Sequence, residues 1–311
     1  ESSTLATWLH DAGYRTGLVG KYLNGYPEAG AESYVPPGWD SWVSPIRGDP
    51  YTEYDYTLND NGNFVEHGAA PADYLGDVLN ARSVSFLRDA PSGKPFFLYV
   101  APFVPHDPAE PAPRYVDAFP DVGLPRPPSF DQEDLSREPR WFRQRRPLLA
   151  SEIRTMETLY RLRLQSMLGV EDLLRQVVDT LDATGRLDDT YIVVTSDNGF
   201  HLGEHRLRPG KETAYEEDIH VPLVIRGPGI ADGTRITDLQ SAIDLAPTIA
   251  ELAGARIPEF VDGASFAARL TGDPSGPGIR RDLLIEHLSR NPAAITPRRD
   301  RKSTRLNSSH T

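Results

Sequence analysis

The chain has 311 residues, of which 39% are hydrophobic and 25% charged, with a formal net charge of −12. This length and composition exclude a miniprotein and are typical of folded globular proteins. The negative charge argues against nucleic acid as a partner, because phosphates would be repelled. No apolar run reaches the roughly 18 residues that a membrane span needs, and no signal peptide is visible.

The chain contains no cysteine and begins at Glu1 without a methionine. The lack of cysteine removes disulfides, zinc–thiolate sites and thiol nucleophiles from the residues present. Because the first residues already follow a helical pattern, we expect natural sequence to precede Glu1. The chain is therefore predicted to be a fragment.

The first third of the chain predicts a helix, a strand and a hairpin. Apolar residues at helical spacing over 4–12 predict a helix that ends at Gly13, and a short strand follows at 14–19. Alternating residues at 54–58 and the turn dipeptide Asn61-Gly62 then predict a surface hairpin.

The next segment predicts a helix, a buried strand and a long irregular excursion. Helical spacing covers 72–88, and the continuous apolar run at 96–101 is typical of a strand buried on both faces. Residues 91–147 hold 13 of the 28 prolines, so little regular structure is expected there. Excursions of this length are often functional.

The second half of the chain predicts further alternation of helices and strands. The most regular helical pattern covers 151–184, and buried strands are predicted at 191–196 and 221–225. The last predicted elements are a helix at 244–253, with Asp244 as its N-cap, and a strand at 282–286. This alternation predicts an α/β sandwich with a mostly parallel sheet.

Three predicted strands are followed by residues that could carry chemistry. Ligands collect at the carboxyl ends of strands in such sheets, because the loops there are exposed on a rigid core. Asp197 and Asn198 follow the strand at 191–196 and offer the hard oxygens that calcium or magnesium prefers. Alternatively, they form an Asx turn that ends the strand.

Single basic residues mark the other loops. His106 lies between prolines after the strand at 96–101 and is a candidate general acid, or a surface histidine. Lys21 and Lys211 each follow a glycine and are candidate anion-binding cations, or solvated lysines. Gly13–Lys21 does not match a phosphate loop, since position 15 is Arg and position 22 is Tyr.

Two further patterns allow other interpretations. Residues 201–205 match the H-x-x-E-H motif of a group of metalloproteases, but Gly203 disfavours the helix which that chemistry needs. An arginine-rich stretch could attract an anionic polymer or form a solvated loop; it contains Arg137, Arg140, Arg143, Arg145 and Arg146.

Taken together, the motifs resemble the type I sulfatases, in the variant seen in N-acetylglucosamine-6-sulfatases. Residues 13–24 (GYRTGLVGKYLN) are similar to the second signature of that family, and Pro105–Pro108 to its histidine loop. Ser196–Gly199 resembles its calcium-binding strand end, and the segment from Gly210 to Pro222 resembles the one that carries its second sulfate-binding lysine.

The resemblance implies an alkaline-phosphatase-like α/β/α sandwich and hydrolysis of a sulfate monoester. It implies one calcium ion on Asp197 and Asn198, sulfate binding by Lys21 and Lys211, and leaving-group protonation by His106. The nucleophile would be a formylglycine in a segment before Glu1, so the chain by itself is expected to be inactive. The expected substrate is a sulfated sugar, with 6-O-sulfated N-acetylglucosamine in a glycan as one candidate, or an aryl sulfate.

The chain departs from the family pattern in several places. The formylglycine motif and the aspartate pair that completes the calcium site are absent, and Leu23 and Asn24 stand where many sulfatases have a histidine. Residues 1–272 are expected to be the C-terminal part of the catalytic domain and 273–291 the start of a truncated subdomain. The tail at 292–311 is expected to be disordered, and 302–311 resembles a translated sequencing artefact.

Other functions stay open at this point. A phosphomonoester or phosphonate hydrolase of the same superfamily would use the same cations and calcium ion. A chain that lacks the nucleophile could instead be an inactive remnant that binds sulfated glycans. The resemblance also implies a secreted, periplasmic or lysosomal-type compartment.

Overall fold

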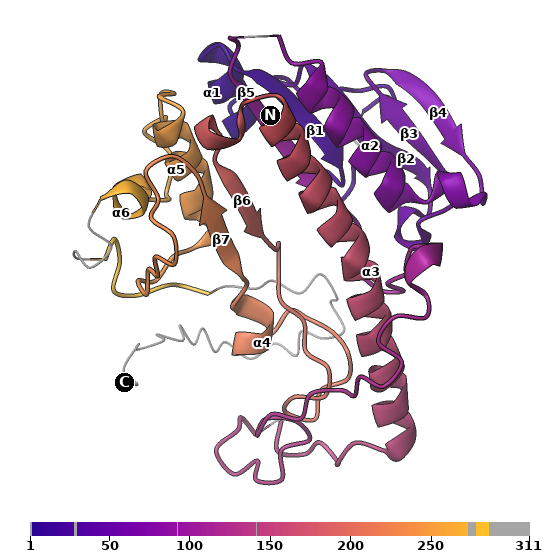
Figure 1. Ribbon diagram of the computed structural model, residues 1–311. Coiled ribbons are helices and arrows are strands. Elements are labelled where there is room, and N and C mark those ends of the chain that lie inside the picture. Colours follow the sequence, from indigo (N-terminus) through magenta and orange to yellow (C-terminus); the bar gives the residue numbers. More distant parts are fainter. Residues whose placement is uncertain (1, 28–29, 92, 141, 273–277, 286–311) are drawn as a thin grey trace.

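The computed structural model describes every residue except 1, 28–29, 92, 141, 273–277 and 286–311 (Figure 1). The predicted tail at 292–311 and part of the predicted C-terminal subdomain lie outside the described residues.

The four predicted helices are present within three residues of their expected ends. Thr4 caps α1 through its side chain, which accepts a hydrogen bond from the backbone N–H of Thr7. The helices are α1 Leu5–Asp11, α2 Leu75–Arg88, α3 Ala150–Ala183, α4 Glu216–Ile219, α5 Leu245–Leu252 and α6 Ala267–Thr271.

The strands form two sheets. A five-stranded sheet has the order β4-β3-β2-β1-β5, in which β1 runs parallel to both β2 and β5 while the β3–β4 hairpin is antiparallel. The second sheet is the antiparallel pair β6–β7. The strands are β1 Arg15–Gly20, β2 Ser41–Gly48, β3 Tyr56–Asp60, β4 Asn63–His67, β5 Phe96–Ala101, β6 Ile192–Thr195 and β7 Leu223–Arg226.

The predicted α/β class is confirmed, and the hairpin turns at Asn61-Gly62 as expected, with positive φ at both residues. The sequence reading did not find β2, which carries the fully buried Trp42. The hairpin also differs from the prediction, because β3 is buried and extends the main sheet rather than lying on the surface.

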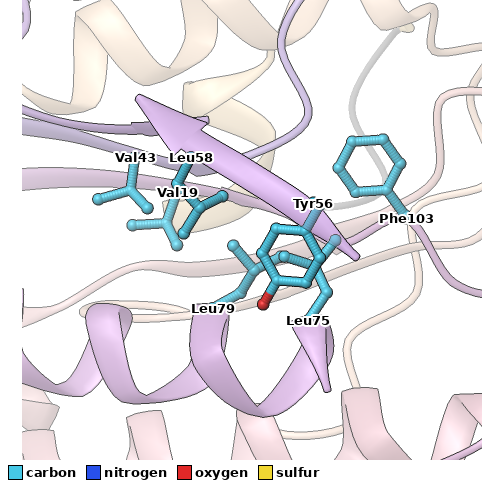
Figure 2. Packing of buried hydrophobic residues seen from close by; sticks show 7 residues of the cluster. All are labelled: Val19, Val43, Tyr56, Leu58, Leu75, Leu79 and Phe103. Atoms are coloured by element: carbon cyan, nitrogen blue, oxygen red, sulfur yellow. The ribbon is translucent and has the colours of Figure 1, made fainter. Parts of the chain in front are cut away.

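One face of the five-stranded sheet packs against α2. Figure 2 shows the apolar side chains that meet there, contributed by β1, β2, β3, α2 and the loop after β5. The cluster consists of Val19, Val43, Tyr56, Leu58, Leu75, Leu79 and Phe103. It fixes the carboxyl ends of β1 and β5 on a rigid support.

The long helix α3 joins the main sheet to the rest of the molecule (Figure 1). Its C-terminal part packs with α2, β5 and β6 through Phe86, Leu181 and Ile192. Its N-terminal part packs against the proline-rich excursion and the loop after β6, through residues that include Met156 and Leu202. The excursion has almost no regular structure, as predicted.

Several detailed predictions are wrong. β5, β6 and β7 are not buried on both faces: Tyr99 is 50% exposed, Val194 37% and Val224 62%. All three are edge strands in the described chain, so an apolar run did not imply full burial. Residues 282–285 form no strand, and residue 286 lies outside the described residues.

Asp244 occupies the predicted N-cap position of α5, but its side chain does not cap the helix. Its carboxylate makes no capping hydrogen bond to α5. Instead it accepts from the backbone N–H groups of Ser241 and Ala264 and pairs with Arg280, in a fully buried position. In the described part of the chain, no helix has both the length and the apolar character needed to cross a membrane.

Candidate active site

Lys21 and the loop of His106 leave the sheet side by side. Gly20 and Ala101, the last residues of β1 and β5, are register partners, and the Lys21 N–H donates to the Ala101 carbonyl at 2.8 Å. Gly20 has φ +113°, and a Cβ there would lie 2.1 Å from the Ala101 oxygen. Only glycine therefore allows the two strands to end this close together.

Tyr51 brings the two predicted residues together. Its ring centroid lies 5.5 Å from Lys21 Nζ and 4.3 Å from the centroid of the exposed His106 ring. His106 Nδ1 lies 2.8 Å from the Asp107 carbonyl oxygen, which can accept only from a protonated Nδ1. Nε2 is then the ring nitrogen that can exchange a proton.

Asn198 and Lys211 form a second contact between predicted residues. Lys211 Nζ donates to Asn198 Oδ1 at 3.0 Å, although 13 residues separate them. Asp197, which precedes Asn198 at the end of β6, is exposed. The loop lies tightly on its neighbour, because a Cβ on Gly199 would come within 2.0 Å of the Glu217 carbonyl oxygen.

The side chains of Arg163 and Tyr99 connect the group around Lys21 and His106 to the group around Asn198 and Lys211. The Arg163 guanidinium of α3 donates to the Pro105 carbonyl at 2.6 Å and lies 4.4 Å above the Phe200 ring, so it contacts both loops. Its burial lowers its pKa, and the Asp107 carboxylate opposes that effect. Partial burial raises the pKa of Tyr99 on β5, with the nearby Asp197 carboxylate adding to the rise and Lys21 opposing it.

These contacts bring Lys21 and His106 to one side of the candidate site and Asn198 and Lys211 to the other. Sequence reasoning missed Tyr51, Tyr99 and Arg163, which supply the links. A tyrosine or arginine in a loop or helix carries no local signal of such a contact.

The metalloprotease interpretation of His201 and His205 does not fit the geometry. Residues 201–205 form no helix, so the two imidazoles do not share a helical face. The buried His201 Nδ1 lies 2.8 Å from Asp218 Oδ1, and His205 Nδ1 lies 3.0 Å from Gln132 Oε1. Asp218 also accepts two hydrogen bonds from Thr213, which makes this group a structural clamp on the loop.

Asp197 and Asn198 suit calcium in kind but not in number. A carboxylate and an amide oxygen are hard donors, whereas calcium takes six to eight oxygens. Within the described ranges, no group of three or more histidine, aspartate or glutamate side chains could hold a metal ion. The Asn198 oxygen already accepts from a cation, the Lys211 ammonium.

Comparison with known proteins gives consistent results. Residues 1–255 match the sulfatase family. The chain is 39% identical over 279 residues to the N-acetylglucosamine-6-sulfatases of Bos taurus and Homo sapiens, covering 88% of this chain and 49% and 50% of theirs. It is 38% identical over 286 residues to an arylsulfatase of Volvox carteri, covering 82% of this chain and 43% of the relative. The chain thus spans about half the length of these relatives.

Solved structures share the fold. A structure described as a complex with its substrate D-glucosamine-2-N,6-O-disulfate aligns with a TM-score of 0.74 at 23% identity, covering 93% of this chain and 68% of that one. A phosphonate monoester hydrolase of Agrobacterium radiobacter aligns with a TM-score of 0.69 at 20% identity, covering 94% and 66%. The expected alkaline-phosphatase-like fold is therefore confirmed. From the family match and these relatives, we conclude that the chain belongs to the sulfatase family.

Proposed function

We propose that the protein hydrolyses a sulfate monoester at the candidate site, where β1, β5 and β6 end. Two contacts support this proposal: Lys21 lies beside Tyr51 and His106, and Lys211 donates to Asn198. Arg163 contacts both loops, through Pro105 and Phe200. Two ammonium groups from different loops suit the nonbridging oxygens of a tetrahedral anion. In sulfuryl transfer, as in phosphoryl transfer, such charge placement is a large part of catalysis.

His106 is the proposed general acid. In the neutral tautomer with Nδ1–H on the Asp107 carbonyl, Nε2 takes up a proton from solvent and passes it to the oxygen of the departing alcohol. Tyr51 and the hydrogen bond from Arg163 to Pro105 hold the loop and orient the ring.

The family resemblance adds a calcium ion, which would bring positive charge to the sulfate oxygens, and a formylglycine, which would supply the nucleophile. We propose Asp197 and Asn198 as the ligands that this chain contributes to that calcium site, the remaining oxygens coming from other groups. For Asn198 to bind the ion, Lys211 has to leave its oxygen, which frees the ammonium group for a sulfate oxygen.

The proposed substrate is a 6-O-sulfated N-acetylglucosamine unit of a glycan. The names of the N-acetylglucosamine-6-sulfatase relatives support it, as does the disulfated glucosamine named as substrate in the aligned structure. An extracellular sulfatase of Drosophila melanogaster, 38% identical over 270 residues, supports a compartment outside the cytosol.

A phosphonate or phosphate ester hydrolase is the second candidate, and the fold shared with the Agrobacterium radiobacter phosphonate monoester hydrolase favours it. The sulfate ester is preferred because relatives named sulfatases match at 38–39% identity over most of the chain.

The test measures turnover of the natural protein that carries this chain, on N-acetylglucosamine 6-sulfate, an aryl sulfate, an aryl phosphate and an aryl phosphonate. We expect the sulfate esters to have the highest kcat/KM. Lys21→Ala, Lys211→Ala and His106→Ala should each lower kcat/KM by about 100-fold or more. Lys94→Ala is the matched control, because Lys94 lies just before β5, at the opposite end of that strand from His106.

Each alternative predicts a different result. Higher kcat/KM on the phosphonate or phosphate ester would assign the protein to the second class. Binding of a sulfated sugar without turnover of any ester would identify a glycan-binding remnant. Unchanged kinetics in all three variants would disprove the proposed site.

A further inference from the structure

The arginine pocket is a cavity of about 280 Å³ at the N-terminal end of α3, and its lining includes neither lysine of the candidate site. It is formed by the arginine-rich stretch, the first turn of α3 and the loop that leads to Lys211. Its lining residues are Arg145, Arg146, Leu148, Glu152, Arg206 and Arg208. Four guanidinium groups thus share one cavity with a single carboxylate.

The carboxylate of Glu152 already interacts with arginines through both of its oxygens. Glu152 accepts two hydrogen bonds from Arg146 at 2.8 Å and pairs with Arg208 at 3.0 Å. The bonds from Arg146, the Leu149 N–H and Arg208 lower the pKa of Glu152 to about 2, so it stays ionised. Two guanidinium groups therefore share one negative charge, and no carboxylate that lines the cavity pairs with Arg145 or Arg206.

The other two arginines have unused donors. Arg206 bonds through its terminal nitrogens to the carbonyls of Arg145 and Glu133, while its Nε lies 3.8 Å from the Asp131 carboxylate, too far for a hydrogen bond. The Nε atoms of both Arg145 and Arg206 are buried and have no hydrogen-bond acceptor among the described residues. Arg145 instead lies over the Phe142 ring at 5.1 Å. Buried donors without acceptors are rare in folded proteins, and an anion or a water molecule would satisfy these two.

We propose that the arginine pocket binds a sulfate or carboxylate group of a glycan chain, on a sugar other than the one that carries the scissile ester. Guanidinium groups match the oxygen geometry of both anions. This proposal rests on the proposed function only in one respect, namely that the sugar with the scissile ester would lie at the candidate active site. Lys211 is three positions after Arg208, so their Cα atoms are at most about 11 Å apart.

A purely structural role for the arginines is the competing explanation. It accounts for the hydrogen bonds of Arg206 to carbonyl oxygens and for the ion pairs of Glu152. It leaves Arg145 without an ion pair among the described residues and both Nε atoms without acceptors.

The test uses the double variant Arg145→Gln/Arg208→Gln of the natural protein that carries this chain, and leaves the more buried Arg206 in place. The matched control is Arg175→Gln, a 58% exposed arginine on α3 outside both sites. Binding of a heparin-derived tetrasaccharide is measured by calorimetric titration, and KM and kcat are measured for the same tetrasaccharide and for N-acetylglucosamine 6-sulfate. The lysine variant Arg145→Lys/Arg208→Lys keeps the charges.

We expect the double glutamine variant to weaken tetrasaccharide binding and raise its KM about tenfold, with kcat unchanged and the monosaccharide constants unaltered. The lysine variant should weaken tetrasaccharide binding by about threefold or less, and the control variant should bind as the wild type does. Tetrasaccharides with reduced carboxyl groups or without O-sulfates distinguish the two anions, because only removal of the bound group abolishes the difference between wild type and variant.

Equal tetrasaccharide affinity in the wild type and a folded glutamine variant would overturn the inference, as would a KM that rises equally for the monosaccharide. Because titration needs no turnover, failure of the proposed hydrolysis leaves this test intact. If the glutamine variant does not fold, the lysine variant and the salt dependence of wild-type binding decide the question: affinity that is independent of ionic strength contradicts an arginine–anion contact.

Discussion

The candidate site lies between two regions that are stabilised in different ways. In the five-stranded sheet, β1 is buried along nearly its whole length and its end is fixed by apolar packing. In the β6–β7 pair, two of the four residues of each strand are exposed, and the loop after β6 combines apolar packing of Leu202 with polar contacts such as His201–Asp218. Half of the site therefore depends on the hydrophobic core of the main sheet, and the other half depends in addition on a small network of hydrogen bonds.

The two regions also differ in how they accommodate a buried carboxylate. Glu53 in the first region is fully buried, accepts one hydrogen bond from the Gly76 N–H, and has no hydrogen-bond partner for Oε1 in the part of the chain that the structure describes. Asp218 in the second region is buried beside a histidine and a threonine that satisfy it. Ionisation should therefore destabilise the first region and support the second.

The largest expected effect is that the free energy of unfolding falls as the pH rises, and that the Glu53→Gln variant does not show this fall. Burial, with the charges of Asp77 and Glu110, raises the pKa of Glu53 to about 8. Because the pKa of Glu53 is higher in the folded state, protonated Glu53 contributes its full stability below about pH 4.5. This contribution to the free energy of unfolding is lost as the pH rises through 8, and the loss is at most about 5 kcal/mol. Urea unfolding at pH 5, 7 and 9 measures it. Parallel profiles for wild type and variant would contradict the prediction.

Leu58→Ala tests the hydrophobic half. Leu58 is fully buried in the cluster of Figure 2, so the free energy of unfolding should fall by about 2–5 kcal/mol. Urea unfolding at pH 7 checks this, with Leu284→Ala, 62% exposed, as the control. A loss below about 1 kcal/mol would mean that the cluster does not support the sheet.

Asp218→Asn tests the polar half. The amide replaces one acceptor by a donor, so at least one hydrogen bond to His201 or Thr213 is lost, at about 1–3 kcal/mol. The expected result is local: amide exchange of Gly199 and Phe200, which donate to carbonyls of residues 218 and 217, should accelerate while β1 stays protected. Uniform acceleration across both regions would contradict the division.

The smallest effect is expected for Val224→Thr on β7. The side chain is 62% exposed, and threonine keeps its branched shape, so the free energy of unfolding should change by less than about 0.5 kcal/mol. A loss near 2 kcal/mol in urea unfolding would indicate that another surface covers this face.

Sequence patterns predicted most elements because those elements depend on local periodicity. The helix α3 and the strand β5 have strong patterns of this kind. The strand β2 contains Pro45 and lacks regular alternation, so only its neighbours reveal it. The prediction that β5, β6 and β7 are buried on both faces failed for a related reason. An apolar run shows that a strand can be buried, but the neighbouring elements decide whether it is buried.

The candidate site was predictable only in part. Strand ends and charge pointed to Lys21, His106 and Asn198, since the carboxyl ends of strands are known in advance to gather ligands. The contact of Tyr51 with His106 spans 55 positions and that of Arg163 with Pro105 spans 58. No local pattern encodes such pairs, because they arise from the way the sheet and α3 pack.

The helix α3 also sets a length. Glu152 in the arginine pocket and Arg163 beside the histidine loop lie on this one helix, 11 residues apart, which corresponds to about 16 Å along its axis. A continuous helix neither stretches nor shortens appreciably, so the separation between the two sites is constant. A linear polyanion that contacts both the arginine pocket and the histidine loop must therefore be long enough to reach from one end of this segment to the other, and a shorter one contacts only one of them.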